Sequence, residues 1–309
     1  MTRSLVIGSR GSKLALWQSE QAKSQLLLLN PGVEIRLEII KTSGDVKTDP
    51  LTVIGGKGVF TKELEDALLE GTIDIAVHSL KDLPTVLPTG LAINAICERE
   101  DPRDALVLRH GPKVRDASLR NLPQGAVVGT SSQRRLAQLK GLRSDVQIKD
   151  VRGNVDTRLR KLDEGQFDAL ILASAGLRRL GLSDRISAAI SIEEMLPAVG
   201  QGAVAIETRA DDPFTVDAVR KLEHRDTRIA CLAERSLLRE LGGGCQFPIA
   251  AHAIVELRSL RLEGLVASSD GSQILREHIS GPSVEAEQLG IELAARLITR
   301  GANSILERQ

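Results

Sequence analysis

Along most of the chain, short apolar runs typical of strands alternate with longer amphipathic segments typical of helices. Short apolar runs such as residues 4–8 and 73–77 have the length and composition of buried strands. Longer amphipathic segments follow them, and the first runs from the capping residue Ser12 to about Leu29, before the stop signal Asn30-Pro31-Gly32. This alternation predicts an α/β fold with mostly parallel, doubly wound sheets.

The same alternation divides the chain. A charged connector at residues 98–104 separates two α/β regions, and the strand predicted at 203–207 can return to the first of them. The last third changes character, with a helix before Gly242, three strands and a final helix, which is typical of a small α+β domain. The predicted domains are a first lobe (residues 1–98 and 201–220), a second lobe (99–200) and a C-terminal domain (221–309).

Composition excludes several classes of protein. The chain of 309 residues has a formal net charge of zero, four Phe, one Trp and no Tyr, so neither a basic surface nor base-stacking side chains point to nucleic acid. Its three cysteines are widely spaced and its five histidines form no metal-binding motif. Without a leader or a long apolar run, we expect a cytoplasmic protein with no metal and no membrane partner.

Arginines occupy an unusual position at predicted strand ends. Arg134 and Arg135 fall in the first turn of a helix, where the helix dipole disfavours cations by roughly 0.3–1 kcal/mol each. Arg10 and Arg152 stand at similar helix starts, and Arg158 follows one turn later. A single arginine is usually a solvated charge. Their recurrence predicts a ligand with several carboxylates or phosphates.

Two further features offer chemistry. Lys81 and Asp82 follow a predicted strand and precede Leu83-Pro84, so they are expected in a turn at the rim of a cleft, where an acid can face a developing cation. Cys245 follows three glycines that end a helix, which leaves room for a bulky group at the sulfur. From the residues alone, burial as a small hydrophobic side chain is the more frequent fate of such a cysteine.

Several motifs together resemble one family. They are Ala15-Leu16-Trp17-Gln18, Gly55-Gly56-Lys57-Gly58-Val59-Phe60, His78-Ser79-Leu80-Lys81-Asp82-Leu83-Pro84, Gly129-Thr130-Ser131-Ser132-Gln133-Arg134-Arg135, Arg152-Gly153-Asn154-Val155, Pro197-Ala198-Val199-Gly200-Gln201-Gly202 and Gly243-Gly244-Cys245. In this order they resemble hydroxymethylbilane synthase, also called porphobilinogen deaminase. Gly11 and Lys13 differ from a Gln and a Pro common in some members.

The resemblance implies a specific activity. The family condenses four porphobilinogen units with loss of ammonia, on a dipyrromethane cofactor held by a thioether, and then releases linear hydroxymethylbilane by hydrolysis. The attachment site matches Cys245, and the catalytic carboxylate, which stabilises cationic azafulvene-type intermediates, matches Asp82.

The resemblance also implies a set of binding residues. Those matching the cofactor-binding positions are Thr130, Ser132, Arg134, Arg135 and Lys81. Those matching the substrate-binding positions are Arg10, Ser12, Arg152, Arg158, Lys57, Phe60 and Gln201. Lys57 and Phe60 match the family's lid, which we expect at residues 42–58, with Phe60 just after it.

The predicted architecture is therefore two doubly wound lobes around a cleft, like those of periplasmic binding proteins, with a small C-terminal α+β domain. We expect a monomer. A non-catalytic, two-lobed anion-binding protein is the alternative; it explains the arginines but gives no role to Cys245 or Asp82. An anion-sensing regulatory domain is a further alternative, although no DNA-binding helical pair is recognisable.

Overall fold

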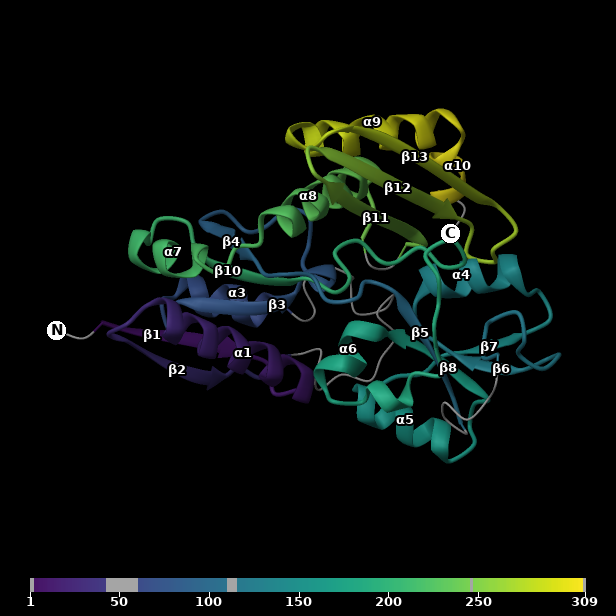
Figure 1. Cartoon of the computed structure of the whole chain (residues 1–309), viewed down its shortest axis with the longest axis horizontal. Coiled ribbons are helices and arrows are strands. Elements are labelled where there is room, and N and C mark those ends of the chain that lie inside the picture. The colour runs from purple at the N-terminus through teal and green to yellow at the C-terminus, as the bar shows by residue number, and fades with distance from the viewer. Residues whose placement is uncertain (1–2, 43–60, 110–115, 245–246, 308–309) are drawn as a thin grey trace. The chain divides into compact units, whose positions relative to one another are not determined.

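The computed structural model describes residues 3–42, 61–109, 116–244 and 247–307 (Figure 1). The chain clusters into two compact units, one formed by residues 1–100 and 203–229 and the other by residues 101–202 and 230–309. The three-domain division predicted from the sequence, with boundaries near residues 98, 200 and 220, stays a prediction.

The first unit is built on a five-stranded sheet in the order β2-β1-β3-β10-β4. Its strands are β1 (Arg3–Ser9), β2 (Val33–Ile39), β3 (Ile75–Ser79), β4 (Leu91–Ile96) and β10 (Val204–Arg209). Strands β1, β2 and β3 are parallel, whereas β10 runs antiparallel to both β3 and β4.

Helices cover both faces of this sheet because successive strand residues point to opposite sides. Leu5 and Ile7 of β1 pack in a core with α1 (Lys13–Leu29) and α7 (Pro213–Arg220). Val6, between them, packs instead with α3 (Lys62–Leu69). All three side chains are buried, so this strand reads as a continuous apolar run.

The second unit contains a sheet of the same design, in the order β7-β6-β8-β5-β9. Its strands are β5 (Asp104–Leu108), β6 (Val127–Gly129), β7 (Gln147–Lys149), β8 (Ala169–Ala173) and β9 (Ala188–Ala189). Leu106 packs on the face of α4 (Gln133–Leu142), and Val107 packs on the face of α5 (Val155–Asp163) and α6 (Ser174–Arg179).

One strand in each five-stranded sheet runs against its neighbours, β10 in the first and β5 in the second. The remaining strands of each sheet share one direction, so the prediction of mostly parallel sheets is confirmed. Each reversed strand follows a connection from the other unit, residues 98–103 or 197–203, and not a helical crossover within its own sheet.

An antiparallel sheet, β11 (Ile249–Glu256), β12 (Ser259–Ala267) and β13 (Ile274–Pro282), completes the second unit. Helix α9 (Ala286–Thr299) covers it and is followed by α10 (Ala302–Leu306), both yellow in Figure 1. Leu237 of α8 (Arg225–Glu240) lies so close to Gly264 that a Cβ there would approach its Cδ1 to 2.6 Å. Ala250 and Leu265 pack with Ala137 of α4.

Most predicted elements agree with the structure to within a few residues. Ser12 caps α1, and Thr61 is the N-cap residue of α3. The sequence interpretation did not predict β5, β9, α6, α7 or α10. No helix in the described ranges is long and apolar enough to cross a membrane.

Candidate active site

Four predicted site residues follow two neighbouring strands of the first unit. Arg10 and Ser12 come after β1, and Lys81 and Asp82 come after β3. Since β1 and β3 are adjacent and parallel, their carboxyl ends meet at one edge of the sheet. The structure thus brings these four residues to the same edge.

Asp82 is presented to solvent by a short, well-anchored turn. Leu80–Asp82 form a single 3₁₀ turn after β3, closed by the Leu83 N–H donating to the Leu80 carbonyl at 3.2 Å. Leu80 and Leu83 are buried, 1% and 4% exposed, while Asp82 between them is exposed and Lys81 half-buried. The two leucines hold the turn and leave the carboxylate outside.

The start of α1 is arranged to attract an anion. The Ser12 hydroxyl accepts a hydrogen bond from the Ala15 N–H at 3.3 Å, and the first turn carries no acidic side chain. Arg10, half-buried, precedes this helix end. The remaining amide groups and the positive end of the helix dipole favour a carboxylate there.

Gln18 is a residue of this edge whose role sequence reasoning missed. It is 3% exposed on α1, and its side-chain amide donates to the Ser79 hydroxyl at 3.0 Å, just before Lys81 and Asp82. A glutamine on the buried side of an amphipathic helix was the available signal, because a buried amide needs a polar partner.

The second unit also gathers predicted residues at one sheet edge, where the parallel strands β6 and β7 end. Thr130 is buried and its hydroxyl accepts from the Ser132 N–H at 3.3 Å. The Arg152 Nε pairs with Asp150 at 2.6 Å, and the Arg158 Nε donates to the Gly153 carbonyl at 2.7 Å. Both arginines are half-buried and already contact the chain.

Arg134 and Arg135 meet an anion that belongs to the protein. Both are buried, and both donate to the carboxylate of Asp104, Arg134 Nη1 at 2.7 Å and Arg135 Nη2 at 2.7 Å. Further bonds go to the carbonyls of Leu196 and Ile171. The helix-start position of these arginines therefore needs no ligand to explain it.

Asp104 is the second residue that sequence reasoning missed. It is fully buried, which by itself raises its pKa, but the two guanidinium groups reverse that effect and hold the pKa of its carboxyl below the usual value. It remains a carboxylate at neutral pH. The signal was a charged residue at the first position of an apolar run, Ala105–Leu108, which the sequence interpretation assigned to a connector.

Gln201 joins the same cluster. It is 1% exposed, and its side-chain amide donates to the Pro102 carbonyl at 2.7 Å and to Asp104 at 3.0 Å. In the described part of the chain, the arrangement carries two guanidinium charges against one carboxylate, a formal net charge of +1. A carboxylate ligand remains compatible with that charge.

Cys245, Lys57 and Phe60 lie outside the described residues. The glycines before Cys245 are described. Gly242 ends α8 with φ +65°, and the N–H groups of Gly242 and Gly243 donate to the Arg239 and Leu238 carbonyls, which confirms the predicted helix end.

The structure gives a different account of each of the three glycines before Cys245. Gly242 adopts the left-handed conformation, whereas a Cβ on Gly243 would lie 2.3 Å from Ile249 Cδ1 and 2.9 Å from Leu238 Cδ1. Around Gly244, a Cβ would have no atom within 4 Å. A Cβ on Gly242 would likewise meet no atom within 4 Å, so close packing requires a glycine at position 243 alone among these three.

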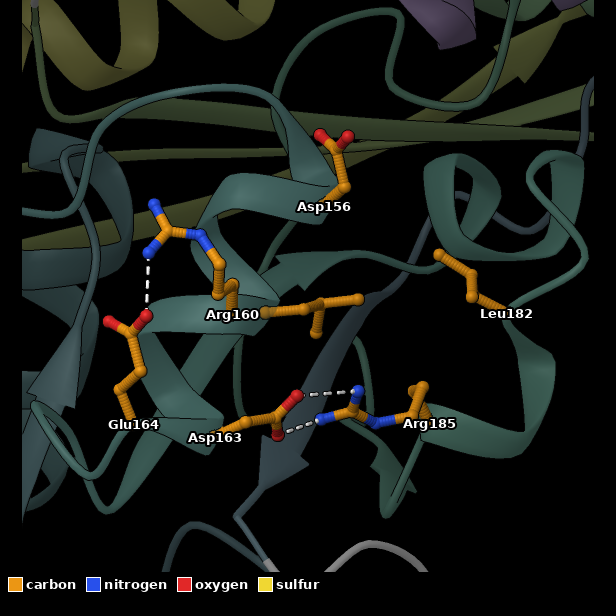
Figure 2. A pocket seen from close by; sticks show the side chains of 7 residues that line it. Asp156, Arg160, Asp163, Glu164, Leu182 and Arg185 are labelled. Carbon is orange, nitrogen blue, oxygen red and sulfur yellow. Dashed lines mark hydrogen bonds and ion pairs between the residues drawn. The ribbon is translucent and has the colours of Figure 1, made fainter.

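A pocket in the second unit does not coincide with the predicted residues. Figure 2 shows it against α5, lined by Asp156, Leu159, Arg160, Asp163, Glu164, Leu182 and Arg185. Arg160 pairs with Glu164 at 2.6 Å and Arg185 with Asp163 at 2.6 Å. Because none of the predicted site residues lines this pocket, we do not assign the active site to it.

Both α/β units carry cations and polar side chains near the carboxyl ends of parallel strands, where proteins of the open-sheet α/β class bind their ligands. Comparison with known proteins identifies the family. Residues 5–217 match the family model "Porphobilinogen deaminase, dipyromethane cofactor binding domain", and residues 228–299 match "Porphobilinogen deaminase, C-terminal domain".

A relative from Pelobacter propionicus, named porphobilinogen deaminase, is 52% identical over 306 residues, covering 99% of this chain and 97% of its own length. The chain belongs to the porphobilinogen deaminase family, a family of transferases, and contains its dipyrromethane-binding domain.

Solved structures with weaker similarity include a TRAP periplasmic solute-binding protein from Desulfovibrio salexigens, with a TM-score of 0.45, 13% identity and 74% of each chain covered. Another is the probable amino-acid transporter binding protein YtmK from Bacillus subtilis, with a TM-score of 0.44, 13% identity, and 72% of this chain and 90% of that chain covered. Similarity at this level supports no functional argument.

Proposed function

We propose that this chain condenses porphobilinogen into hydroxymethylbilane, with Cys245 as the attachment point of the dipyrromethane cofactor and Asp82 as the catalytic carboxylate. Family membership over nearly the whole chain supports the activity. The exposed position of Asp82 at the end of β3, on an otherwise buried turn, is the structural observation that carries its role.

Asp82 has the geometry that charge stabilisation requires. Its turn is fixed by two buried leucines and by the Leu80 N–H, which donates to the Ala203 carbonyl at 3.0 Å. A carboxylate held in this way can face positive charge as it develops on a substrate, without reorganising during the reaction. It can also accept hydrogen bonds from pyrrole N–H groups.

The substrate's carboxylates require cationic partners. Each porphobilinogen unit brings two carboxylates, and we propose that Arg10, Ser12 and Lys81 bind them at the edge of the first unit. Arg10 supplies a guanidinium, Ser12 stands at the N-terminus of α1, and Lys81 neighbours Asp82. Arg10 is suited to this because a guanidinium pairs bidentately and keeps its proton.

We assign Thr130, Ser132, Arg134 and Arg135, with Lys81, to the carboxylates of the cofactor. One observation in the second unit fits that group: among the described residues, the Nε of Arg134 is buried without a hydrogen-bond acceptor. A buried donor left unpaired is costly, and a carboxylate would satisfy it. When bound, dipyrromethane supplies the pyrrole terminus to which substrate units are added.

The other assignments stay proposals from the family resemblance. Arg152 and Arg158 would bind substrate carboxylates beside β7, and Lys57 and Phe60 would do so from a lid. Gln201 already uses its amide on Pro102 and Asp104, so its contribution to substrate would come from the turn that it holds. We further propose that the protein works as a cytoplasmic monomer.

Product formation tests the proposal. Wild-type protein should release one hydroxymethylbilane for every four porphobilinogen molecules consumed, with ammonia released at each condensation. Asp82→Asn should fold and carry the cofactor, but turn over about 10²–10³-fold more slowly, since it loses a preorganised charge at the reacting centre. Asp66→Asn, an exposed acid on α3, is the matched control and should match wild type.

The outcomes separate the alternatives. A wild-type protein that binds porphobilinogen without consuming it would be a non-catalytic anion-binding protein. Near-normal turnover by Asp82→Asn would remove Asp82 from the mechanism while leaving the activity in place.

A further inference from the structure

Three titratable side chains outside the set of predicted site residues are buried together in the first unit. They are Glu65 on α3, His78 on β3 and Glu207 on β10, exposed by 7%, 5% and 0%. His78 Nε2 lies 2.9 Å from Glu207 Oε2. In the antiparallel ladder His78 faces Ala205 and Glu207 faces Ala76, so the two side chains meet diagonally across β3 and β10.

This cluster is not explained by stability. In the described part of the chain, neither carboxylate oxygen of Glu207 accepts a well-aligned hydrogen bond, and His78 Nε2 donates none. The contact between them is therefore mainly electrostatic. Replacing a buried ion pair by neutral groups is often neutral or stabilising, so such a pair suggests a role other than stability.

The charge on the cluster follows from its surroundings. Burial raises the pKa of Glu65, and nearby Glu207 raises it further, against opposing effects of Thr61 and His78. Among the described residues, the acidic groups that act on His78 come from α3 (Glu65) and from β10 (Glu207). The effects of Glu207 and His78 on Glu65 show that the three side chains form one electrostatically coupled cluster.

The pair lies at the base of the turn that carries Asp82. His78 and Ser79 end β3, and Leu80–Asp82 follow directly. Strand β10 holds this strand end again at two further points, since Val204 faces Ser79 in the ladder and the Ala203 carbonyl accepts from the Leu80 N–H. A shift of His78 relative to β10 would therefore move the Asp82 turn.

We propose that His78 and Glu207 are positioning residues for Asp82, their contact fixing the end of β3 against β10 so that the carboxylate is correctly placed for the condensation. The inference rests on the proposed catalytic role of Asp82. It adds a requirement for catalysis that lies outside the substrate-binding surface, since both residues of the pair are buried.

The decisive variants are Glu207→Gln and the double variant His78→Gln/Glu207→Gln, assayed as cofactor-loaded protein. Glu207→Gln should lower kcat by about 10–100-fold with KM nearly unchanged, since small misplacements of a catalytic group have effects of this size. The double variant, with no charge left to bury, should unfold at a denaturant concentration equal to or above that of wild type and still turn over slowly.

Two controls make the result specific. Glu65→Gln makes the same chemical change in the same cluster but leaves the contact between His78 and Glu207 in place, so turnover should stay near wild type. Histidine ¹⁵N NMR, assigned with His78→Gln, should show that the Nε2 resonance of His78 shifts in Glu207→Gln, because that nitrogen loses its contact with the Glu207 carboxylate.

Wild-type kcat in the loaded double variant would overturn the inference, leaving the pair a purely structural feature. A slow Glu207→Gln alongside a fully active Asp82→Asn would overturn it too, because the pair would then act on something other than Asp82. Absence of turnover in wild type would instead count against the proposed function itself.

Discussion

Arg134 and Arg135 show how far a single-residue argument reaches. Cations in the first turn of a helix are unfavourable, which correctly marked both as needing an anion. The structure identifies this anion as Asp104, which lies 30 residues before Arg134 and 31 residues before Arg135 in the sequence. Sequence spacing alone could not reveal this partner, because the contact depends on how β5 and α4 pack.

At this scale, Asp104→Asn should strongly destabilise the protein. It leaves two buried guanidinium groups without their carboxylate, a loss of about 3–5 kcal/mol in the free energy of unfolding. Urea denaturation measures it. Asp163→Asn, which breaks the more exposed pair with Arg185, is the control and should change the same quantity by about 0–1 kcal/mol. Equal effects of the two variants would contradict the account.

The same residue predicts a pH dependence. The pKa of Asp104 is lower in the folded chain than in the unfolded chain, so the unfolded chain takes up a proton first as pH falls. Its contribution to stability is complete above the unfolded value of about 4 and declines below it. As the pH is lowered below about 4, the urea midpoint should therefore decrease more steeply in wild type than in Asp104→Asn. Parallel curves for the two proteins would refute this.

Among elements, the helices and strands with a clear period were predictable. Ser12 and Gly242 marked the two ends of helices that the structure contains. Strand β5 was missed because its first residue, Asp104, continues a charged connector, and α7 was missed although Asp212 and Pro213 form a helix-start signal. Two doubly wound α/β regions were predictable, but the strand order of their sheets and the reversed direction of β10 and β5 were not, because these depend on how the strands pair.

The loop between α8 and β11 yields a prediction at the element scale. Gly243→Ala should lower the free energy of unfolding by about 1–3 kcal/mol, because the added Cβ overlaps Ile249 and Leu238. It should also slow cofactor loading by shifting the segment that leads to Cys245. Gly244→Ala, where the new methyl group meets no atom within 4 Å, is the matched control and should fold as wild type does. Equal stability of both variants would show that the loop does not depend on the close contact.

For the whole molecule, the two compact units divide the proposed work. The first unit carries Arg10, Ser12, Lys81 and Asp82 at one sheet edge, and the second carries the arginine cluster and the segment leading to Cys245. The resemblance of the motifs predicted the family, which the family models and the 52% identical relative confirm. The buried partners Asp104, Gln18 and Glu207 emerged only from the packing within each unit.

The mass of the intact protein tests the central claim most directly. Purified wild type should weigh more than its sequence by two linked pyrrole units and, shortly after porphobilinogen is added, should show further one-unit increments. Cys245→Ala should show neither, whereas Cys97→Ala should keep both. A wild-type protein that stays at its sequence mass after exposure to porphobilinogen, or an adduct that survives in Cys245→Ala, would contradict the account.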